Sequence, residues 1–357
     1  MDLTVPTRFA DRDWERPVPD APLRIAVVGL GWFGREIAIP GIERADHCEL
    51  GAVVSGDREK AERVAAESGA DSALTYDEYA DGAGTDAYDA VYVVTPNALH
   101  LPHVETAADH GKHVICEKPL EATADRAREV VSVCEDAGVT LMTAYRMQAT
   151  RSVRWVRDRI GAGVVGDPVQ VHGEFSFDLL ADGDPDQWRL DPDMAGGGAL
   201  VDIGVYPLNT ARFLLDADPV AVGADTVENP PHFDGVDEHV AFQLSFPDGA
   251  TASCTASYGA SAANRLSVLG TEGRIVLEPV FDVDADRTIT VERDGSSVSV
   301  DAAEPSEVAE EFDYFATGAL TGMEIEPDGA DGVVDVEVIE AVYESAESGR
   351  RVSLDGE

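Results

Sequence analysis

Two segments of this 357-residue chain carry side chains that can do chemistry on a ligand. Lys118, within Glu117-Lys118-Pro119, follows an apolar run and is one of only three lysines, so we expect it to bind or react. Asp202 and Tyr206 lie four residues apart, so on a helix they share one face, which Asn209 continues. The same spacing also fits an N-capping aspartate and a core tyrosine.

A glycine-rich turn follows the first apolar run, RIAVV. Its sequence is Gly29-Leu-Gly31-Trp-Phe-Gly34. In this context the motif predicts a dinucleotide site: Gly29 permits the tight turn, Gly31 lets the backbone approach a pyrophosphate, and Gly34 allows close packing of helix and strand. The helix N-terminus then faces the phosphates. We expect Trp32 and Phe33, inside the motif, to border the cofactor.

The end of the second predicted strand distinguishes two dinucleotides. An NAD site places Asp or Glu there, about 20 residues beyond the glycines. This chain has Ser55 instead, which removes a carboxylate that would repel a 2′-phosphate, and Arg58 and Lys60 follow as cationic donors. Asp57 keeps NAD open as the alternative, because its carboxylate could accept from the ribose. The segment favours NADP.

Two further loops end at the same predicted sheet edge. Thr95-Pro96-Asn97 ends the fourth strand, and Glu117-Lys118-Pro119 ends the fifth. A doubly wound sheet binds its ligands at this edge. His100 lies one helical turn after Asn97, where it fits either a ligand contact or a packed histidine.

The elements that position these residues fall into two halves. From residue 23 to 144, short β-branched runs alternate with helical stretches, which predicts an α/β Rossmann domain with a doubly wound parallel sheet. Residues 145–357 show recurring strands, and the pairs Asp248-Gly249 and Asp294-Gly295 favour hairpins. We expect an α+β substrate and oligomerisation domain with a large, open, mainly antiparallel sheet. Residues 1–22 form a polar N-terminal arm.

The composition excludes several classes of protein. The net charge of -43 would repel nucleic acid. The 26 basic residues include only three lysines, which predicts a halophilic protein adapted to molar salt, where the screening length is about 3 Å. The four cysteines contain no CxxC pair and are expected to be reduced and buried. No signal peptide, membrane span or metal motif is apparent, so a cytoplasmic protein without a metal is expected.

Six ordered motifs resemble those of one enzyme family. They are GLGWFG, VSGDREKA, VVTPNALH, CEKPL, QWRLDPDMAGGGALVDIGVYPLN and VLGTEGRIVLEP. From Arg24 onward the chain is therefore similar to the Gfo/Idh/MocA family of NAD(P)-dependent oxidoreductases. The QWRL run and Tyr206 make it most similar to the branch of glucose–fructose oxidoreductase and NADP-dependent D-xylose 1-dehydrogenase. Many family members carry histidine in place of Tyr206.

The resemblance implies roles for individual residues. Lys118 and Tyr206 form the catalytic centre, Lys118 precedes a cis proline, and Asp202 holds the sugar. The implied cofactor-binding residues are Gly29, Gly31, Trp32, Phe33, Gly34, Ser55, Arg58, Lys60, Tyr76, Thr95, Pro96, Asn97, His100, Glu117, Lys118, Arg146, Trp188 and Arg189. The implied substrate-binding residues are Lys118, Arg146, Asp202, Tyr206 and Asn209.

The implied activity is that of an NADP-dependent aldose 1-dehydrogenase, most similar to D-xylose 1-dehydrogenase. Such an enzyme oxidises the anomeric carbon to an aldonolactone by hydride transfer to nicotinamide. Tyrosine has a pKa near 10, and the Lys118 ammonium would favour its phenolate, so Tyr206 is the expected base. The reverse assignment, with Lys118 as the base, stays open.

Other functions are compatible with the same fold. A glucose–fructose oxidoreductase-like enzyme, an inositol dehydrogenase and a trans-dihydrodiol dehydrogenase differ only in the substrate. A non-catalytic NADP- or sugar-sensing regulator would not need Lys118, Asp202 and Tyr206 together. The open sheet would expose apolar area, so we also expect a homo-oligomer.

Overall fold

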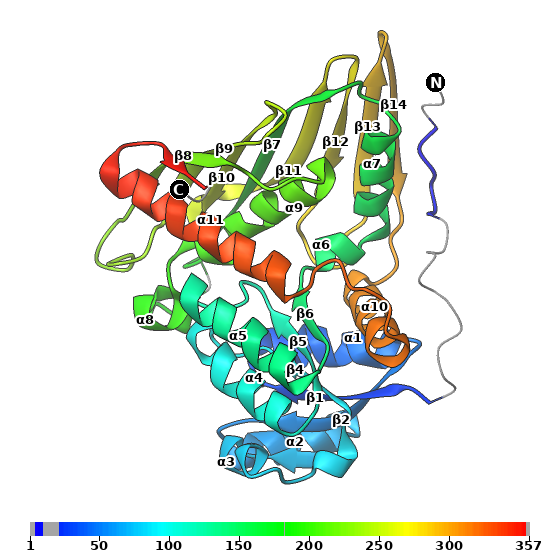
Figure 1. Ribbon diagram of the computed structural model, residues 1–357, viewed down its shortest axis with the longest axis vertical. Helices are drawn as coiled ribbons and strands as arrows, with labels where there is room; N and C mark the ends of the chain where they lie inside the picture. Colours follow the sequence, from blue (N-terminus) through cyan, green and yellow to red (C-terminus); the bar gives the residue numbers. More distant parts are fainter. Residues whose placement is uncertain (1–3, 10–20, 182, 355–357) are drawn as a thin grey trace. The chain divides into compact units, whose positions relative to one another are not determined.

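The computed structural model divides into two compact units. It describes residues 4–9, 21–181 and 183–354 (Figure 1). The nucleotide unit contains residues 21–149 and 305–333. The sheet unit contains residues 4–9, 150–181, 183–304 and 334–354. Part of the predicted N-terminal arm lies outside the described residues, while Val5 and Phe9 of that arm are buried in the sheet unit.

A six-stranded parallel sheet forms the centre of the nucleotide unit. Its strands are β1 (Leu23–Val28), β2 (Cys48–Val54), β3 (Ser72–Leu74), β4 (Ala90–Val93), β5 (His113–Glu117) and β6 (Leu141–Ala144), in the order β3-β2-β1-β4-β5-β6. Val27, Val53 and Val91 are fully buried, as expected for strands covered on both faces. The order confirms the predicted doubly wound sheet, and it gathers the loops after β1, β4 and β5 at one edge.

Several helices of the nucleotide unit begin at residues that cap a helix N-terminus and end at glycines. The helices of this unit are η1 (Gly34–Ala38), α1 (Ile39–Arg44), α2 (Arg58–Ser68), α3 (Tyr76–Ala80), η2 (Thr85–Ala87), η3 (Asn97–Leu99), α4 (His100–Asp109), α5 (Ala124–Ala137), α6 (Arg146–Ala149) and α10 (Glu307–Thr321). Thr75 and Glu78 form a capping box at α3, and Thr123 caps α5. Gly69 and Gly138 end α2 and α5 in the left-handed conformation that glycine adopts without steric cost.

Helix α10 belongs to the nucleotide unit although it follows the second sheet in the sequence. It packs on α1. Its Asp313 carboxylate accepts the backbone N–H groups of Asp46 and His47 at 3.1 and 2.8 Å. The predicted division into 23–144 and 145–357 did not include this return of residues 305–333.

The sheet unit is built on nine strands in the order β14-β13-β12-β11-β7-β10-β9-β8-β15. They are β7 (Pro168–Asp178), β8 (Ala221–Val227), β9 (His239–Ser245), β10 (Thr251–Ser257), β11 (Gly259–Gly270), β12 (Gly273–Glu278), β13 (Arg287–Arg293), β14 (Ser296–Ala302) and β15 (Val352–Ser353). Only β7 and β10 pair in parallel among these described strands. This confirms the predicted large, mainly antiparallel sheet. Strand β8 was not predicted, because its run AVGADTV mixes valines with small and acidic residues.

Tight turns join two of the antiparallel pairs. Between β13 and β14, Asp294 and Gly295 have φ of 52° and 74°, the positive values that a type I′ hairpin turn requires. Between β9 and β10, Gly249 has φ of 87°. Both predicted hairpins are therefore confirmed.

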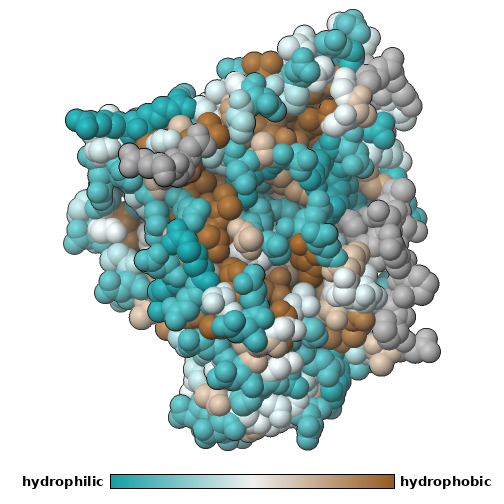
Figure 2. Space-filling view, in the orientation of Figure 1, coloured by the Kyte–Doolittle hydropathy of each residue, from teal (hydrophilic) through white to brown (hydrophobic). Residues whose placement is uncertain are grey.

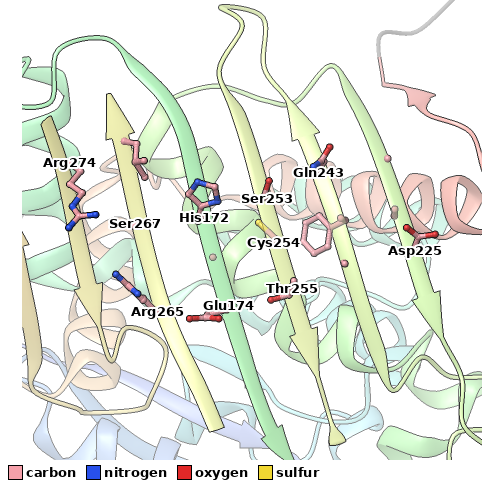
Figure 3. Close-up of a pocket in the computed structure, with 16 residues that line it drawn as sticks. His172, Glu174, Asp225, Gln243, Ser253, Cys254, Thr255, Arg265, Ser267 and Arg274 are labelled. Carbon is pink, nitrogen blue, oxygen red and sulfur yellow. The ribbon is translucent and has the colours of Figure 1, made fainter. Parts of the chain in front are cut away.

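Helices cover one face of the nine-stranded sheet (Figure 1). The helical segments of this unit are α7 (Arg151–Gly161), η4 (Trp188–Leu190), α8 (Pro192–Ala195), η5 (Leu200–Gly204), α9 (Val205–Leu215) and α11 (Gly329–Ser348). The first five residues of α11 are counted with the nucleotide unit. In the close-up of Figure 3 the helices lie behind the sheet, while His172, Ser253 and Gln243 project from its other side. Phe9 of the arm packs on Trp155 of α7, with ring centroids 6.1 Å apart.

The surface and the cysteines agree with the composition. Hydrophilic side chains dominate the face shown in Figure 2. Within residues 4–9, 21–181 and 183–354, no helix is long and apolar enough to cross a membrane. Cys48, Cys116, Cys134 and Cys254 are buried free thiols, as predicted.

Candidate active site

The three glycines of the first turn meet three different steric demands. Gly29 has φ of 109°, and a Cβ there would lie 2.6 Å from the Val94 carbonyl oxygen. A Cβ on Gly34 would overlap the Gly29 carbonyl oxygen. Around Gly31, by contrast, no described atom lies within 4 Å of a Cβ position, so its backbone is open to a ligand. This is the division of roles that a pyrophosphate-binding turn needs.

Side chains beside the turn also fit a bound dinucleotide. Trp32 is 64% exposed, and Phe33 is half-buried next to it. The methyl group of Thr95 lies 3.1 Å from the Cβ position of Gly29, while its buried hydroxyl has no hydrogen-bond partner among the described residues. A buried hydroxyl without a partner costs free energy, so a polar ligand at this edge would stabilise it.

The loop between β2 and α2 carries the features that distinguish NADP from NAD. Ser55 is buried, and its hydroxyl accepts the Asp57 N–H at 3.2 Å. The Asp57 carboxylate caps α2 by accepting the Lys60 N–H at 3.1 Å. Binding a ribose would compete with this cap. Tyr76 borders the same loop, because a Cβ on Gly56 would lie 3.3 Å from its ring.

The two cations of this loop are held differently. The Arg58 guanidinium donates to the Ala73 carbonyl oxygen at 2.8 Å and pairs with Glu78 of α3. Lys60 is half-buried, and no ion pair within the described part of the chain engages its ammonium group. Lys60 is therefore better placed than Arg58 to receive a 2′-phosphate.

His100 is a core residue, which corrects the expectation that it binds the cofactor. It is fully buried, and its ring nitrogens lie 3.1 and 3.0 Å from the carbonyl oxygens of Leu120 and Thr95. Burial lowers the pKa of the imidazole. His100 thus ties the loop after β4, which includes Pro96 and the buried Asn97, to the loop after β5.

Lys118 follows β5 at the same sheet edge. The Lys118–Pro119 peptide bond is cis, as the resemblance implied. The Lys118 side chain is half-buried. The Glu117 carboxylate accepts the Lys118 backbone N–H at 3.1 Å and also accepts the Tyr92 hydroxyl. Glu117, expected to contact the cofactor, therefore holds the backbone of Lys118.

Arg146, expected to bind the cofactor and the substrate, is buried instead. Its side chain is only 4% exposed and forms an ion pair with Glu307 of α10, which is 1% exposed. A buried guanidinium needs such a partner, because an uncompensated buried charge is costly. The ion pair between Arg146 and Glu307 therefore holds α6 and α10 together.

One helical segment of the sheet unit carries both Asp202 and Tyr206. The wide turn of η5 leads into α9, and between residues 201 and 210 only these two are partly exposed. They therefore share one accessible side, as their spacing predicts. The Tyr206 ring lies against Phe175 and Phe281, with centroids 5.6 and 5.8 Å away, which fixes its orientation.

Two donors hold the Asp202 carboxylate. Arg189 Nε and the Tyr258 hydroxyl donate to the same oxygen, Oδ2, at 3.0 and 2.8 Å. Arg189 also stacks on the Trp188 ring, with its guanidinium carbon 4.7 Å from the centroid. Burial raises the pKa of Tyr258 well above its ordinary value, so its hydroxyl stays a donor. Sequence reasoning missed Tyr258, because no motif surrounds it.

A buried carboxylate fixes the glycine loop before η5. Asp237 is 2% exposed and accepts the N–H groups of Gly198 and Leu200, both at 2.8 Å, and the Tyr343 hydroxyl at 2.6 Å. Gly197 has φ of 154°, and a Cβ there would overlap the Tyr343 hydroxyl. Burial raises the pKa of Asp237, against the effect of its hydrogen bonds. Nothing in the sequence around Asp237 signalled this role.

Two family models together match more than half of this chain. An oxidoreductase family with an NAD-binding Rossmann fold matches residues 23–145, and the GFO/IDH/MocA C-terminal domain matches residues 153–276. The chain belongs to the GFO/IDH/MocA oxidoreductase family. The six motifs therefore predicted the family correctly.

Individual relatives within the family cover nearly the whole chain. The chain is 49% identical over 351 residues to the D-xylose 1-dehydrogenase (NADP+) of Haloarcula marismortui, covering 97% of this chain and 98% of the relative. It is 36% identical over 339 residues to D-xylose 1-dehydrogenase (NADP+) 2 of Haloferax volcanii, covering 93% and 100%. An aldose–aldose oxidoreductase from Caulobacter crescentus, solved with glycerol, superimposes with a TM-score of 0.88 at 35% identity, covering 93% and 100%.

The family residues divide between the two units. The nucleotide unit carries the glycine turn, Ser55, Lys60 and Lys118, whereas Asp202 and Tyr206 belong to the sheet unit. Asn209, expected to bind substrate, is 1% exposed, and its amide donates to the Asp335 carboxylate at 2.8 Å. Its place in the interior corrects that expectation, because the α9 face turns inward beyond Tyr206.

Proposed function

We propose that this family member is an NADP-dependent aldose 1-dehydrogenase that oxidises D-xylose at its anomeric carbon to the aldonolactone. The observation that carries the proposal is the set Asp202, Arg189 and Tyr258 beside an oriented Tyr206, because it combines a hydroxyl-binding carboxylate with a candidate base. The names of the relatives from Haloarcula marismortui and Haloferax volcanii support both the substrate and the cofactor.

The proposed chemistry is a proton transfer coupled to oxidation of the sugar. Bound NADP+ supplies the hydride acceptor. Tyr206 removes the proton from the O1 hydroxyl, while the Lys118 ammonium donates to O1. The Asp202 carboxylate, paired with Arg189, accepts from a neighbouring sugar hydroxyl.

The preference for NADP rests on the loop after β2. Ser55 and Lys60 would bind the 2′-phosphate, and Tyr76 would border the adenine end. Asp57 supports this choice because its carboxylate already caps α2. Besides Asp57, the Ser55–Lys60 segment contains one other carboxylate that an NAD ribose could bind, that of Glu59 within α2.

A substrate panel tests the proposal. D-xylose, D-glucose, an inositol and a trans-dihydrodiol would each be offered with NADP+ and with NAD+ in concentrated KCl, and the absorbance of the reduced nicotinamide would be followed. The proposal expects the highest kcat/KM with D-xylose and NADP+. Faster turnover of the inositol or the dihydrodiol would contradict it. Binding of NADP without any turnover would indicate the sensing role instead.

A second candidate function is transfer between two aldoses on a retained cofactor. The similarity to the Caulobacter crescentus aldose–aldose oxidoreductase favours it. Such an enzyme would keep its cofactor through dialysis and would form equal amounts of lactone and alditol without added NADP+. If the protein loses its cofactor on dialysis and added NADP+ restores activity, transfer on a retained cofactor is excluded and the dehydrogenase function remains.

We also propose that a second copy of the chain covers the bare face of the nine-stranded sheet. A hollow of about 740 Å³ lies there, lined by side chains such as His172, Gln243, Ser253 and Ser267 (Figure 3). Two acidic residues, Glu174 and Asp225, and two basic residues, Arg265 and Arg274, also line the hollow. Their formal charges cancel, which allows two copies of a chain with a net charge of -43 to approach there. Ser253→Arg should shift the mass measured by light scattering toward the monomer.

The composition suggests where the enzyme works. We propose a role in pentose catabolism in a salt-rich cytoplasm. The excess of 69 acidic over 26 basic residues supports the high-salt setting, because screening removes most of the self-repulsion. Proteomic detection in the soluble fraction of pentose-grown cells, and its absence from membrane and secreted fractions, would test the location.

A further inference from the structure

Three aromatic rings of the sheet unit contact one another around the candidate base. Phe175, on β7, meets the Tyr206 ring edge-on, at 5.6 Å and 81°. Phe281, in the loop between β12 and β13, has its centroid 5.8 Å from that of Tyr206 and 5.4 Å from that of Phe175. Phe281 is fully buried, whereas Tyr206 is partly exposed. Phe281 therefore belongs to the interior packing on which the more accessible Tyr206 ring rests.

A side chain of β11 holds the backbone of this loop. The Asn264 Oδ1 atom accepts the N–H groups of Val280 and Phe281, at 2.8 and 2.7 Å. Asn264 pairs directly with Phe175 between β11 and β7, so both side chains lie on the same face of the sheet. The Asn264 Nδ2 atom is buried and has no hydrogen-bond partner among the described residues. The oxygen is therefore the atom through which this side chain acts on the loop.

A buried arginine holds the carbonyl groups of the same loop. Arg287, at the start of β13, is fully buried. Its Nε and Nη2 atoms donate to the Val280 carbonyl oxygen at 3.1 and 2.9 Å, and its Nη1 atom donates to that of Ala285 at 3.3 Å. The Glu304 carboxylate, on a side chain that is 2% exposed, lies 3.9 Å from Nη1. Burial of a guanidinium is costly, so one whose donors go to a loop backbone favours a role in fixing that loop.

We propose that Phe281 is a positioning residue for Tyr206. Asn264 and Arg287 act through Phe281, because they bind the N–H and the carbonyl of the peptide that leads into it. The direction in which the Phe281 ring leaves the backbone is thereby fixed. A base must meet the sugar hydroxyl at hydrogen-bond distance, so a Tyr206 ring that turns away lowers the rate of proton transfer more than the affinity for the sugar. The role, but not the packing, rests on the proposed function of Tyr206.

Steady-state kinetics in concentrated KCl test the role with Phe281→Leu, which removes the ring but keeps an apolar side chain. The matched control is Phe246→Leu, a buried phenylalanine in the turn before β10, whereas Tyr258 of the site follows the other end of that strand. In Phe281→Leu, kcat should fall about tenfold, while the KM for the aldose and the Kd for NADP change less than about twofold. An unchanged kcat in Phe281→Leu, or an equal loss in the control, would overturn the proposal.

A second pair of variants keeps every aromatic ring. Asn264→Ala removes the acceptor of the two loop N–H groups, and Asn264→Asp keeps an acceptor oxygen in its place. Asn264→Ala should lower kcat with little change in KM, and Asn264→Asp should return kcat to within about threefold of the wild type. If Phe281→Leu does not fold, this pair decides the question, because a wild-type kcat in Asn264→Ala would refute the role of the loop.

A measurement without substrate separates this proposal from the proposed function. With ring-¹³C tyrosine in the full-length protein, the Tyr206 signal is the one among nine tyrosines that Tyr206→Phe loses. This signal should move in Asn264→Ala, return in Asn264→Asp and stay fixed in Phe246→Leu. If no aldose is oxidised, these spectra still decide whether the loop holds the ring. An unmoved signal in Asn264→Ala would show that the loop does not position Tyr206.

Discussion

The Asp202 carboxylate shows how one side chain is prepared for a polar ligand. Both Arg189 and Tyr258 donate to Oδ2, and Tyr258 is itself held between the rings of Phe177 and Phe233, at 5.8 and 6.3 Å. A carboxylate fixed in this way keeps its direction and does not need to reorganise when a sugar binds. The conformational entropy of these side chains is therefore lost during folding and not when the sugar binds.

Tyr258→Phe removes one donor and leaves the ring packing. We expect kcat/KM for the aldose to fall about 10- to 100-fold, because a hydrogen bond to a charged group contributes about 1.5–3 kcal/mol. NADP affinity, measured by fluorescence titration, should stay constant. The control is Tyr88→Phe, which removes a buried hydroxyl that has no hydrogen-bond partner among the described residues. An equal loss in both variants would show that the effect is only structural.

Lys118→Ala and Tyr206→Phe test the proposed acid–base pair. Each should lower kcat by about 10²- to 10⁴-fold, since each removes a group that takes part in the proton transfer. Steady-state kinetics and NADP titration would be measured together. Near-normal turnover in either variant would refute the assignment.

At the scale of elements, the loop before η5 sets the position of the Asp202 and Tyr206 side chains. Asp237 accepts the Gly198 and Leu200 N–H groups, so a single buried carboxylate closes the loop and starts the helical segment. Tyr343 of α11 adds a third donor to the same carboxylate. Residues far apart in the chain therefore determine where Asp202 and Tyr206 lie.

Asp237→Asn should destabilise this segment. The amide offers one acceptor atom instead of two and turns an N–H₂ group toward N–H donors. We expect the free energy of unfolding to fall by about 3 kcal/mol, with a raised KM for the aldose and unchanged NADP binding. Urea unfolding and kinetics provide the measurements. Asp234→Asn, at an exposed position three residues away, should change neither quantity.

At the scale of the whole molecule, the net charge of -43 dominates. Salt screens exposed charges over about 8 Å at physiological ionic strength and over about 3 Å at 1 M. The compact state is therefore opposed by self-repulsion that weakens as salt is added. The hollow on the outer face of the nine-stranded sheet is lined by two acidic and two basic residues, so repulsion is weaker there than the net charge of the chain suggests.

Withdrawal of salt should lower both stability and activity. We expect the Tm to rise steadily with KCl concentration. The kcat/KM should also rise until all of the protein is folded. Scanning calorimetry and kinetics in matched buffers would measure the trend. Sucrose at equal osmolality separates charge screening from general exclusion, since it should stabilise far less. A Tm independent of salt would contradict the halophilic interpretation.

Local sequence determined the parts of this protein that depend on local geometry. The glycines of the first turn, the alternation of strands and helices, the Asp294-Gly295 hairpin and the spacing of Asp202 and Tyr206 all follow from backbone sterics and short-range periodicity, and each was predicted. The family followed from the order of these motifs.

Tertiary structure decided what depends on contacts between distant residues. Tyr258 lies 56 residues from the Asp202 that it holds, and Glu307 lies 161 residues from Arg146. The same packing placed His100 and Asn209 in the interior, although their residue types suit a ligand equally well. Sequence patterns specify which chemistry a side chain can do, but burial and partners decide whether it faces a ligand. These are set only when α9 packs within the sheet unit and α10 packs within the nucleotide unit.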